Sequence, residues 1–363
     1  MQPLRREQLN AAHSSSSKGD ARVQSSSSFT RYHRPRGFFV RRVAVKTEDS
    51  QHWNHVYTRL QRTYAPYVFI SPFFLLFMFF GVFPMIFSIY VSLTSWDAVS
   101  GLGGMKFVGL DNYRFLFTQD TAFWDSVRQT AYIALISGLP QHLIAIPLAF
   151  MIHTGMKRMQ GFVTAVYFAP FVTSVAAIAA VFGTLYSERS GILNWFILEV
   201  LNKIPLLNAI IPDDPVRWLG DRHMIPISIA ILVIWRFTGW NVVLYLAGLQ
   251  AISQDLYEAA EVDGATTFER FRYITLPLLR PTMFTAVTFT IIGNMQLFAE
   301  PFLLVNTAGG TGNAGRTSVL YLWDNAFNNL LMGDAATQTW VLFAIIISLT
   351  AINNFIFAKI RND

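Results

Sequence analysis

Long apolar runs, rather than an alternation of apolar and polar positions, characterise this chain from residue 67 onward. A helix needs about 20 mainly apolar residues to cross a hydrocarbon layer of about 30 Å. Six segments reach that length: residues 67–94, 130–152, 163–186, 225–251, 283–304 and 340–358. Membrane helices tolerate the prolines that lie in or near these segments, because neighbouring groups satisfy the freed carbonyls. The pattern predicts an all-α integral membrane protein with six transmembrane helices.

Composition agrees with lipid as the solvent of these segments. Of the 363 residues, 53% are hydrophobic and only 14% charged, against about 25% charged in soluble domains. The chain has no cysteine, which excludes disulfides, thiolate metal sites and thiol nucleophiles. Its seven histidines form no HExxH pattern, and no GxSxG motif is present. We therefore expect no catalytic residue and no metal site.

Residues 1–63 have a different composition from the remainder, 64–363. Residues 1–66 carry 12 Lys and Arg against four Asp and Glu, and they include the serine runs Ser14–Ser17 and Ser25–Ser28. This segment has too few apolar residues to offset the entropy that a chain loses when it becomes ordered. We therefore expect a largely disordered tail before the membrane domain. A basic segment before a first span indicates orientation and attraction to anionic lipid, and no nucleic acid is expected as a partner.

The distribution of positive charge predicts the topology. Lys and Arg in short flanking segments resist translocation. Six crossings place both termini on one side, and 19 of the 28 basic residues then lie on that side. We therefore expect a multi-pass protein of the cell inner (plasma) membrane with both termini cytoplasmic. Residues 95–129, 187–224 and 305–339 would lie outside.

The cytoplasmic connection 253–281 has the pattern of two short helices. Ser253 is an N-cap for the first, and Gly264 supplies the left-handed residue that ends it. Thr266 and Glu269 form a capping box for the second, which should end at Leu276-Pro277 because proline disfavours helix before it. A unit of this size cannot bury all of its apolar side chains within itself. Some of them therefore need to pack against another protein. These side chains are Leu256, Tyr257, Ala260, Phe268, Phe271 and Ile274.

Nine residues of this connection stand at fixed spacing: Glu258, Ala259, Ala260, Asp263, Gly264, Ala265, Ile274, Leu276 and Pro277. Their arrangement resembles the EAA motif of ABC importer permeases. The resemblance implies the type I ABC importer permease fold, with these nine residues in a coupling loop whose helix sits in a cleft of a separate ATPase. It further implies a second homologous permease subunit, two copies of an ABC ATPase subunit that bind ATP and Mg, an extracytoplasmic solute-binding protein and surrounding membrane lipid. This chain itself would bind no cofactor.

Three further stretches are similar to the carbohydrate branch of that family, the maltose-type and glycerol-phosphate-type permeases. They are Ser92–Trp96 with Phe107–Tyr113, Ala247–Ile252, and Phe298–Pro301 with Gly309-Gly310. Thr311 stands where the branch usually has proline. The resemblance implies transport of a sugar or oligosaccharide.

Polar side chains inside the predicted spans are candidates for substrate binding, because such groups tend to face a cavity or one another. They are Trp235, Trp240, Asn241, Asn294, Gln296 and Glu300. Amides beside an aromatic face suit sugar recognition. Asn and Gln also join helices to one another, and Arg236 with Glu300 is as compatible with a structural ion pair as with a substrate contact. For His142, beside Gln141, packing is the expected role.

Residues 310–317 have the glycine spacing of a phosphate-binding loop, but Arg316 occupies the lysine position and the segment follows a membrane helix. We expect an external turn there, so the chain is not expected to be an enzyme and the ATPase must be another chain. The alternative to an ABC importer permease is a secondary transporter driven by an ion gradient. In such a protein Glu300, Arg236 and His142 would form the relay for the ion. Such a protein has no use for an EAA loop.

Overall fold

The computed structural model describes residues 48–204 and 214–362. The chain divides into two compact units, Met1–Ile70 and Ser71–Asp363. The first contributes part of one helix to the described residues, and the second holds all the other elements.

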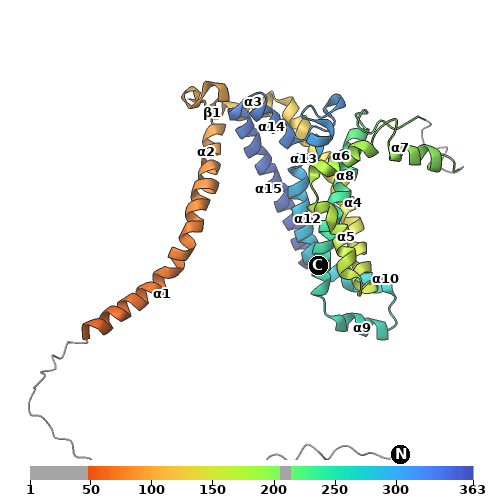
Figure 1. The fold of residues 1–363 in the computed structure, drawn as a ribbon, viewed down its shortest axis with the longest axis horizontal. Coiled ribbons are helices and arrows are strands. Elements are labelled where there is room, and N and C mark those ends of the chain that lie inside the picture. Colours follow the sequence, from red (N-terminus) through yellow and green to blue (C-terminus); the bar gives the residue numbers. More distant parts are fainter. Residues whose placement is uncertain (1–47, 205–213, 363) are drawn as a thin grey trace, which may run out of the picture. The chain divides into compact units, whose positions relative to one another are not determined.

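Helices make up almost all of the described chain (Figure 1). The α-helices are α1 (Glu48–Phe77), α2 (Phe83–Ser92), α3 (Asp111–Thr118), α4 (Thr121–Gly155), α5 (Gln160–Val172), α6 (Val175–Leu185), α7 (Ile192–Phe196), α8 (Met224–Gln250), α9 (Gln254–Val262), α10 (Thr267–Glu269), α11 (Leu276–Leu278), α12 (Arg280–Met295), α13 (Ala299–Val305), α14 (Ser318–Phe327) and α15 (Met332–Asn362). Wide π-type turns form η1 (Met78–Val82), η4 (Ile197–Leu201) and η5 (Arg270–Thr275). Tighter 3₁₀ turns form η2 (Ala98–Ser100), η3 (Leu102–Gly104) and η6 (Thr311–Asn313). The strands β1 (Thr94–Ser95) and β2 (Lys106–Phe107) pair antiparallel.

Five helical stretches are long and apolar enough to cross a membrane, and a bent pair of helices supplies a sixth. The five are Arg62–Ser92, Thr121–Gly155, Met224–Gln250, Arg280–Val305 and Met332–Lys359. Each contains most of one predicted span, so the six-span, all-α architecture is confirmed.

The N-terminal end of the first span differs from expectation. Of the predicted tail 1–63, residues 1–47 lie outside the described residues, whereas α1 begins at Glu48 and continues into the first span. Residues 48–65 contain no glycine or proline, so no residue type in that stretch interrupts a helix that the apolar segment continues.

The third span is not one straight helix. Helices α5 and α6 meet at an angle of 91° across Thr173 and Ser174, both of which have non-helical backbones. The Thr173 hydroxyl donates to the carbonyl of Ala169 at 2.7 Å, so the end of α5 keeps a hydrogen-bond partner. The apolar pattern over residues 163–186 therefore predicts a membrane segment at this place, but it does not predict that the helix is broken within it.

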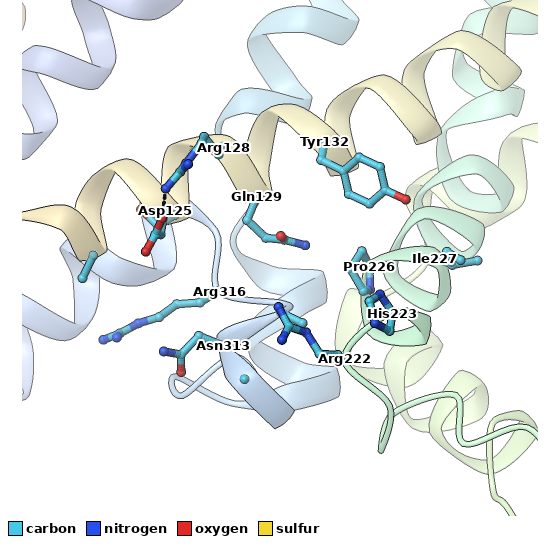
Figure 2. A pocket seen from close by; sticks show the side chains of 14 residues that line it. Asp125, Arg128, Gln129, Tyr132, Arg222, His223, Pro226, Ile227, Asn313 and Arg316 are labelled. Atoms are coloured by element: carbon cyan, nitrogen blue, oxygen red, sulfur yellow. Dashed lines mark hydrogen bonds and ion pairs between the residues drawn. The ribbon is translucent and has the colours of Figure 1, made fainter.

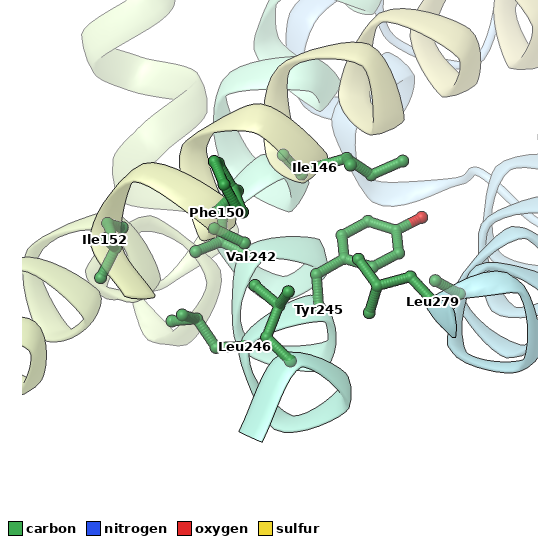
Figure 3. Packing of buried hydrophobic residues seen from close by; sticks show 11 residues of the cluster. Ile146, Phe150, Ile152, Val242, Tyr245, Leu246 and Leu279 are labelled. Atoms are coloured by element: carbon green, nitrogen blue, oxygen red, sulfur yellow. The ribbon is translucent and has the colours of Figure 1, made fainter. Parts of the chain in front are cut away.

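Helix α8 packs closely against two neighbours. A Cβ atom at Gly239 would collide with the backbone carbonyl of Tyr167 on α5, and one at Gly248 would collide with Thr282 on α12. The small residue at each point therefore permits an approach that no side chain would allow. On another face, α8 and α4 bury a shared cluster that includes Ile146, Val242 and Tyr245 (Figure 3).

One of the stretches similar to the carbohydrate branch, Ser92–Trp96 with Phe107–Tyr113, joins the elements at one end of Ser71–Asp363. Asn112 donates to the carbonyls of Ser92 and Thr94 at 3.0 and 2.9 Å, and the hydroxyl of Thr337 on α15 also donates to that of Ser92. The hydroxyl groups of Ser92 and Tyr113 lie 2.9 Å apart. The end of α2, the β1–β2 pair, α3 and α15 are therefore joined by buried polar contacts.

Candidate functional site

The connection after α8 has the two-helix form that its sequence predicts. Helix α9 begins after Ser253, whose hydroxyl accepts from the backbone N–H of Asp255 at 3.3 Å. It ends at Asp263, and Gly264 follows with a φ of +80°, where only glycine is free of strain. The N-cap and the glycine turn are confirmed.

The capping box of the second helix is also present. The Thr266 hydroxyl accepts from the N–H of Glu269 at 3.3 Å, while the Glu269 carboxylate accepts from the N–H of Thr266 at 2.7 Å. The hydrogen bond from the Thr266 backbone lowers the pKa of Glu269 below its ordinary value. The turn between the two helices is therefore closed from both sides.

The prediction that the second helix ends at Leu276-Pro277 is wrong. The chain stays helical through η5 and α11, and α12 follows from Arg280. Within this stretch the N–H of Leu276 donates to the carbonyl of Phe271, five residues back. This wider register loosens the turn just before Pro277, where a regular α-helix would bring the proline ring against the carbonyl of Tyr273. The loop is thus continuous with the membrane helix that follows it.

The inner face of the loop packs on the spans. Tyr257 and Phe271 pack against the buried cluster of α4 and α8, and the rings of Phe150 on α4 and Phe271 are 5.0 Å apart. Within the loop, the hydroxyls of Tyr257 and Thr275 lie 2.9 Å apart. Leu279 is fully buried in the cluster shared by α4 and α8 (Figure 3). A displacement of the loop therefore acts directly on these two helices.

The outer face of the loop is apolar and uncovered. Leu256, Val262 and Phe268 are 47%, 88% and 72% exposed. Of the nine motif residues, Glu258, Ala259, Asp263 and Gly264 are exposed and the other five are half-buried. Arg270 donates to Glu261 at 3.0 Å and so holds the second helix against α9. Burial of the exposed apolar groups would stabilise a complex with another protein.

A cavity of about 420 Å³ separates this loop from the end of α4. Its walls include His153 from the last turn of α4, Lys157 from the α4–α5 connection, and Glu258, Glu261 and Arg270 from the loop. Charged side chains from two connections therefore face the same space.

Three of the six predicted substrate residues are buried and bonded inside the chain. Asn241 donates to Gln141 on α4 at 3.2 Å, and Asn294 donates to Ser137, also on α4, at 3.0 Å. Glu300 on α13 pairs with Arg236 on α8. Each of these contacts joins two helices. A structural contact between helices is the alternative to substrate binding that the sequence allows for these residues.

The other three are more accessible. Trp240 stacks on Phe171 of α5 with ring centroids 4.8 Å apart, while Trp235 is 49% exposed and Gln296 is exposed at the end of α12. None of the six lines the cavity beside α9 or the larger cavity at the other end of the spans. His142 bonds to Tyr245 at 2.8 Å, as expected for packing, and not to the Arg236–Glu300 pair.

The larger cavity, about 610 Å³, contains functional candidates that the sequence patterns missed (Figure 2). Its walls come from three separate segments, at residues 122–132, 222–227 and 312–316. The sequence singles out Arg316 only because it occupies the lysine position of a phosphate-binding loop. Its segment forms the turn η6 after helix α13 rather than following a strand, which agrees with the expected turn.

Known proteins that are similar to this chain are membrane components of transport systems. Residues 129–361 match the model of the family described as "Binding-protein-dependent transport system inner membrane component". The probable ABC transporter permease protein YurN of Bacillus subtilis is 32% identical, over 80% of this chain and 94% of that protein. The lactose transport system permease protein LacF of Rhizobium radiobacter is also 32% identical, over 76% and 88%.

A solved structure is similar in fold. In the bacterial alginate ABC transporter in complex with an alginate pentasaccharide-bound periplasmic protein, one chain superposes with a TM-score of 0.69 and 22% identity. The alignment covers 84% of the present chain and 98% of that chain.

Proposed function

Because this chain belongs to the family of binding-protein-dependent transport system inner membrane components, we propose that it is the permease subunit of an ATP-driven ABC importer of sugars or oligosaccharides. The observation that carries the proposal is the loop from Ser253 to Leu279. It packs on α4 and α8 through its inner face and leaves apolar side chains uncovered on its outer face.

The substrate class follows from the relatives. LacF is named for lactose, and the alginate transporter was solved with a periplasmic protein that carries a pentasaccharide. Both support a saccharide delivered by an extracytoplasmic solute-binding protein. A second permease and two ATPase subunits would complete the transporter, as the resemblance of the EAA loop implies.

In the proposed mechanism, ATP and Mg bind to the partner ATPases and their closure displaces α9. The chain's own glycine-rich turn, residues 310–317, does not fit a nucleotide, because it follows a helix and has Arg316 in the lysine position. The contacts of Tyr257 and Phe271 pass the displacement to the spans. The chain therefore transmits work and carries out no hydrolysis.

We place α9 and both termini on the cytoplasmic side of the inner membrane. The β1–β2 pair, α3 and α14 gather at the opposite end of Ser71–Asp363 from α9 (Figure 1). This separation supports the charge distribution, which assigns the connections at residues 95–129 and 305–339 to the outside.

For substrate contacts along the path we propose Gln296, Trp235 and Trp240, which keep accessible surface. Asn241, Asn294 and Glu300 position the helices around that path, because each bonds to a side chain of a neighbouring helix.

The test is a mild-detergent pull-down of the tagged chain from its native membrane, followed by an ATPase assay. We expect an ATPase and a second permease to co-purify, and Gly264→Pro to abolish ATPase coupling while α8 and α12 remain folded. Val99→Pro, in the exposed outer turn η2, is the matched control. Recovery of the chain alone, without ATPase activity, would favour the secondary transporter.

A further inference from the structure

The cavity of about 610 Å³ lies at the end of Ser71–Asp363 opposite α9, the end that the proposed topology places outside (Figures 1 and 2). It opens between the first turns of α4, the start of α8 and the segment from η6 to α14. Cavities of about 300–1,000 Å³ are of the size that holds a small molecule such as a mono- or oligosaccharide.

Three arginines are among the side chains that line the cavity. The lining contains Arg128, Arg222, Arg316 and His223, against a single carboxylate, Asp125. Arg128 pairs with Asp125, and Arg316 pairs with Asp324 outside the lining. The carboxylate of Asp221, the neighbour of Arg222 in the chain, interacts with the Arg222 charge, so three carboxylates stand near the three arginines. The Arg222 guanidinium nevertheless forms no ion pair among the described residues, and its N–H donors suit an anionic group.

The neutral part of the lining suits a saccharide. Gln129 and Tyr132 project from α4 toward the start of α8, and Asn313 lies across from them (Figure 2). The Nε2 atom of Gln129 is shielded from solvent and has no hydrogen-bond partner in the described structure. An amide donor without an acceptor beside an aromatic ring is suited to a ligand rich in hydroxyl oxygens.

We propose that this outer basic cavity binds the anionic group of an acidic saccharide, so that the transported class is sugars that carry a carboxylate or sulfonate. The inference rests on the proposed function and narrows its substrate. Guanidinium groups form bidentate contacts with carboxylates, and such contacts give specificity as well as affinity. Arg222, which forms no ion pair among the described residues, is the guanidinium group available to such a ligand.

The experiment measures equilibrium binding to the full chain, with whatever partners co-purify, in lipid nanodiscs and without binding protein. The probes are trigalacturonate and its neutral counterpart galactotriose. We expect trigalacturonate to bind at least about tenfold more tightly, and added salt to weaken that binding. Arg222→Gln should reduce trigalacturonate binding about tenfold and leave galactotriose unaffected.

Two further variants distinguish a charge in the cavity from a charge elsewhere on the protein. Arg128→Gln removes a second charge from the cavity, whereas Arg189→Gln removes an exposed charge that lies outside its lining and should change nothing. Arg316 is a poor test residue, because it is half-buried and paired, so its loss would disturb the fold.

Equal binding of the two probes would overturn the inference, as would trigalacturonate binding that survives Arg222→Gln and Arg128→Gln together. Arginine variants that weaken capture of the binding protein but not of trigalacturonate would also overturn it, in favour of a protein carboxylate as the ligand. ATP-dependent uptake of neutral sugars alone would refute this inference and leave the importer intact. Absence of any co-purifying ATPase would refute the importer, while the probe binding would still decide the role of the cavity.

Discussion

A buried pair of opposite charges joins α8 to α13 through Arg236 and Glu300, whose side chains are only 17% and 4% exposed. The sequence shows that an arginine and a glutamate lie in these spans, but it does not determine whether the two form an ion pair. Depth along a straight helix increases by about 1.5 Å per residue, whereas here the span is interrupted after Met295 and resumes at Ala299. The break brings Glu300 to a depth that uniform helical spacing does not give.

Removal of one member of this pair should destabilise the protein strongly. We expect Glu300→Gln to cost about 3–5 kcal/mol, because it leaves the Arg236 charge buried without a partner. Thermal unfolding in lipid nanodiscs measures the effect. The double variant Arg236→Met/Glu300→Leu removes both charges and should recover most of the loss. A double variant as unstable as the single one would show that the pair itself stabilises the protein and that the unpaired Arg236 charge is not the cause of the loss.

The turn glycine permits a prediction at a single backbone position. Gly264→Val forces a β-branched residue into φ +80° and should cost about 1–2 kcal/mol locally. No atom lies near the position of its missing Cβ, so strain rather than collision is the cause. Gly264→Asn, which tolerates this conformation, is the control. Coupled ATPase activity should fall in the valine variant and persist with asparagine; an equal loss in both would indicate a contact rather than strain.

At the scale of elements, the apolar runs and capping residues were sufficient to locate the spans and both helices of the loop. They were not sufficient to locate the bend between α5 and α6 or the continuation through Pro277. Hydropathy measures what surrounds a helix, and it carries no information on backbone hydrogen bonds. The bend depends on the non-helical backbone of Thr173 and Ser174, and the continuation depends on the wide turn η5.

The uncovered face of the loop predicts an interface that a single substitution can weaken. Phe268→Asp should reduce capture of the ATPase about tenfold or more, since burial of a phenylalanine side chain contributes about 1.5–3 kcal/mol. The acidic residue falls in the first turn of its helix, where the dipole favours it, so the helix should remain intact. Val99→Asp, on the exposed outer turn η2, is the matched control. Capture that is equally strong in all three proteins would place the ATPase elsewhere.

At the scale of the whole molecule, the charge distribution predicts which end faces the cytoplasm. The chain has no cysteine, so single cysteines can report their side of the membrane without background. In sealed right-side-out vesicles, Val99→Cys should react with an impermeant thiol reagent and Val262→Cys should react only after permeabilisation. Both residues are strongly exposed, which removes burial as an explanation. The reverse pattern would invert the proposed topology.

The outer basic cavity marks the limit of what the sequence could reveal. Its wall comes from segments nearly 200 residues apart, and its arginines have no local motif to connect them. Only the packing of α4 against α8 and the turn after α13 bring these charges together.

The two close approaches of α8 have a mechanical consequence. At Gly239 the backbones of α8 and α5 touch without an intervening side chain, and at Gly248 the side chain of Thr282 on α12 meets the α8 backbone directly. Nine residues separate the two glycines, which places them on opposite sides of a helix with 3.6 residues per turn. Packed groups in such direct contact leave little room for one helix to shift without the others. We therefore expect α5, α8 and α12 to move together if a partner displaces α9.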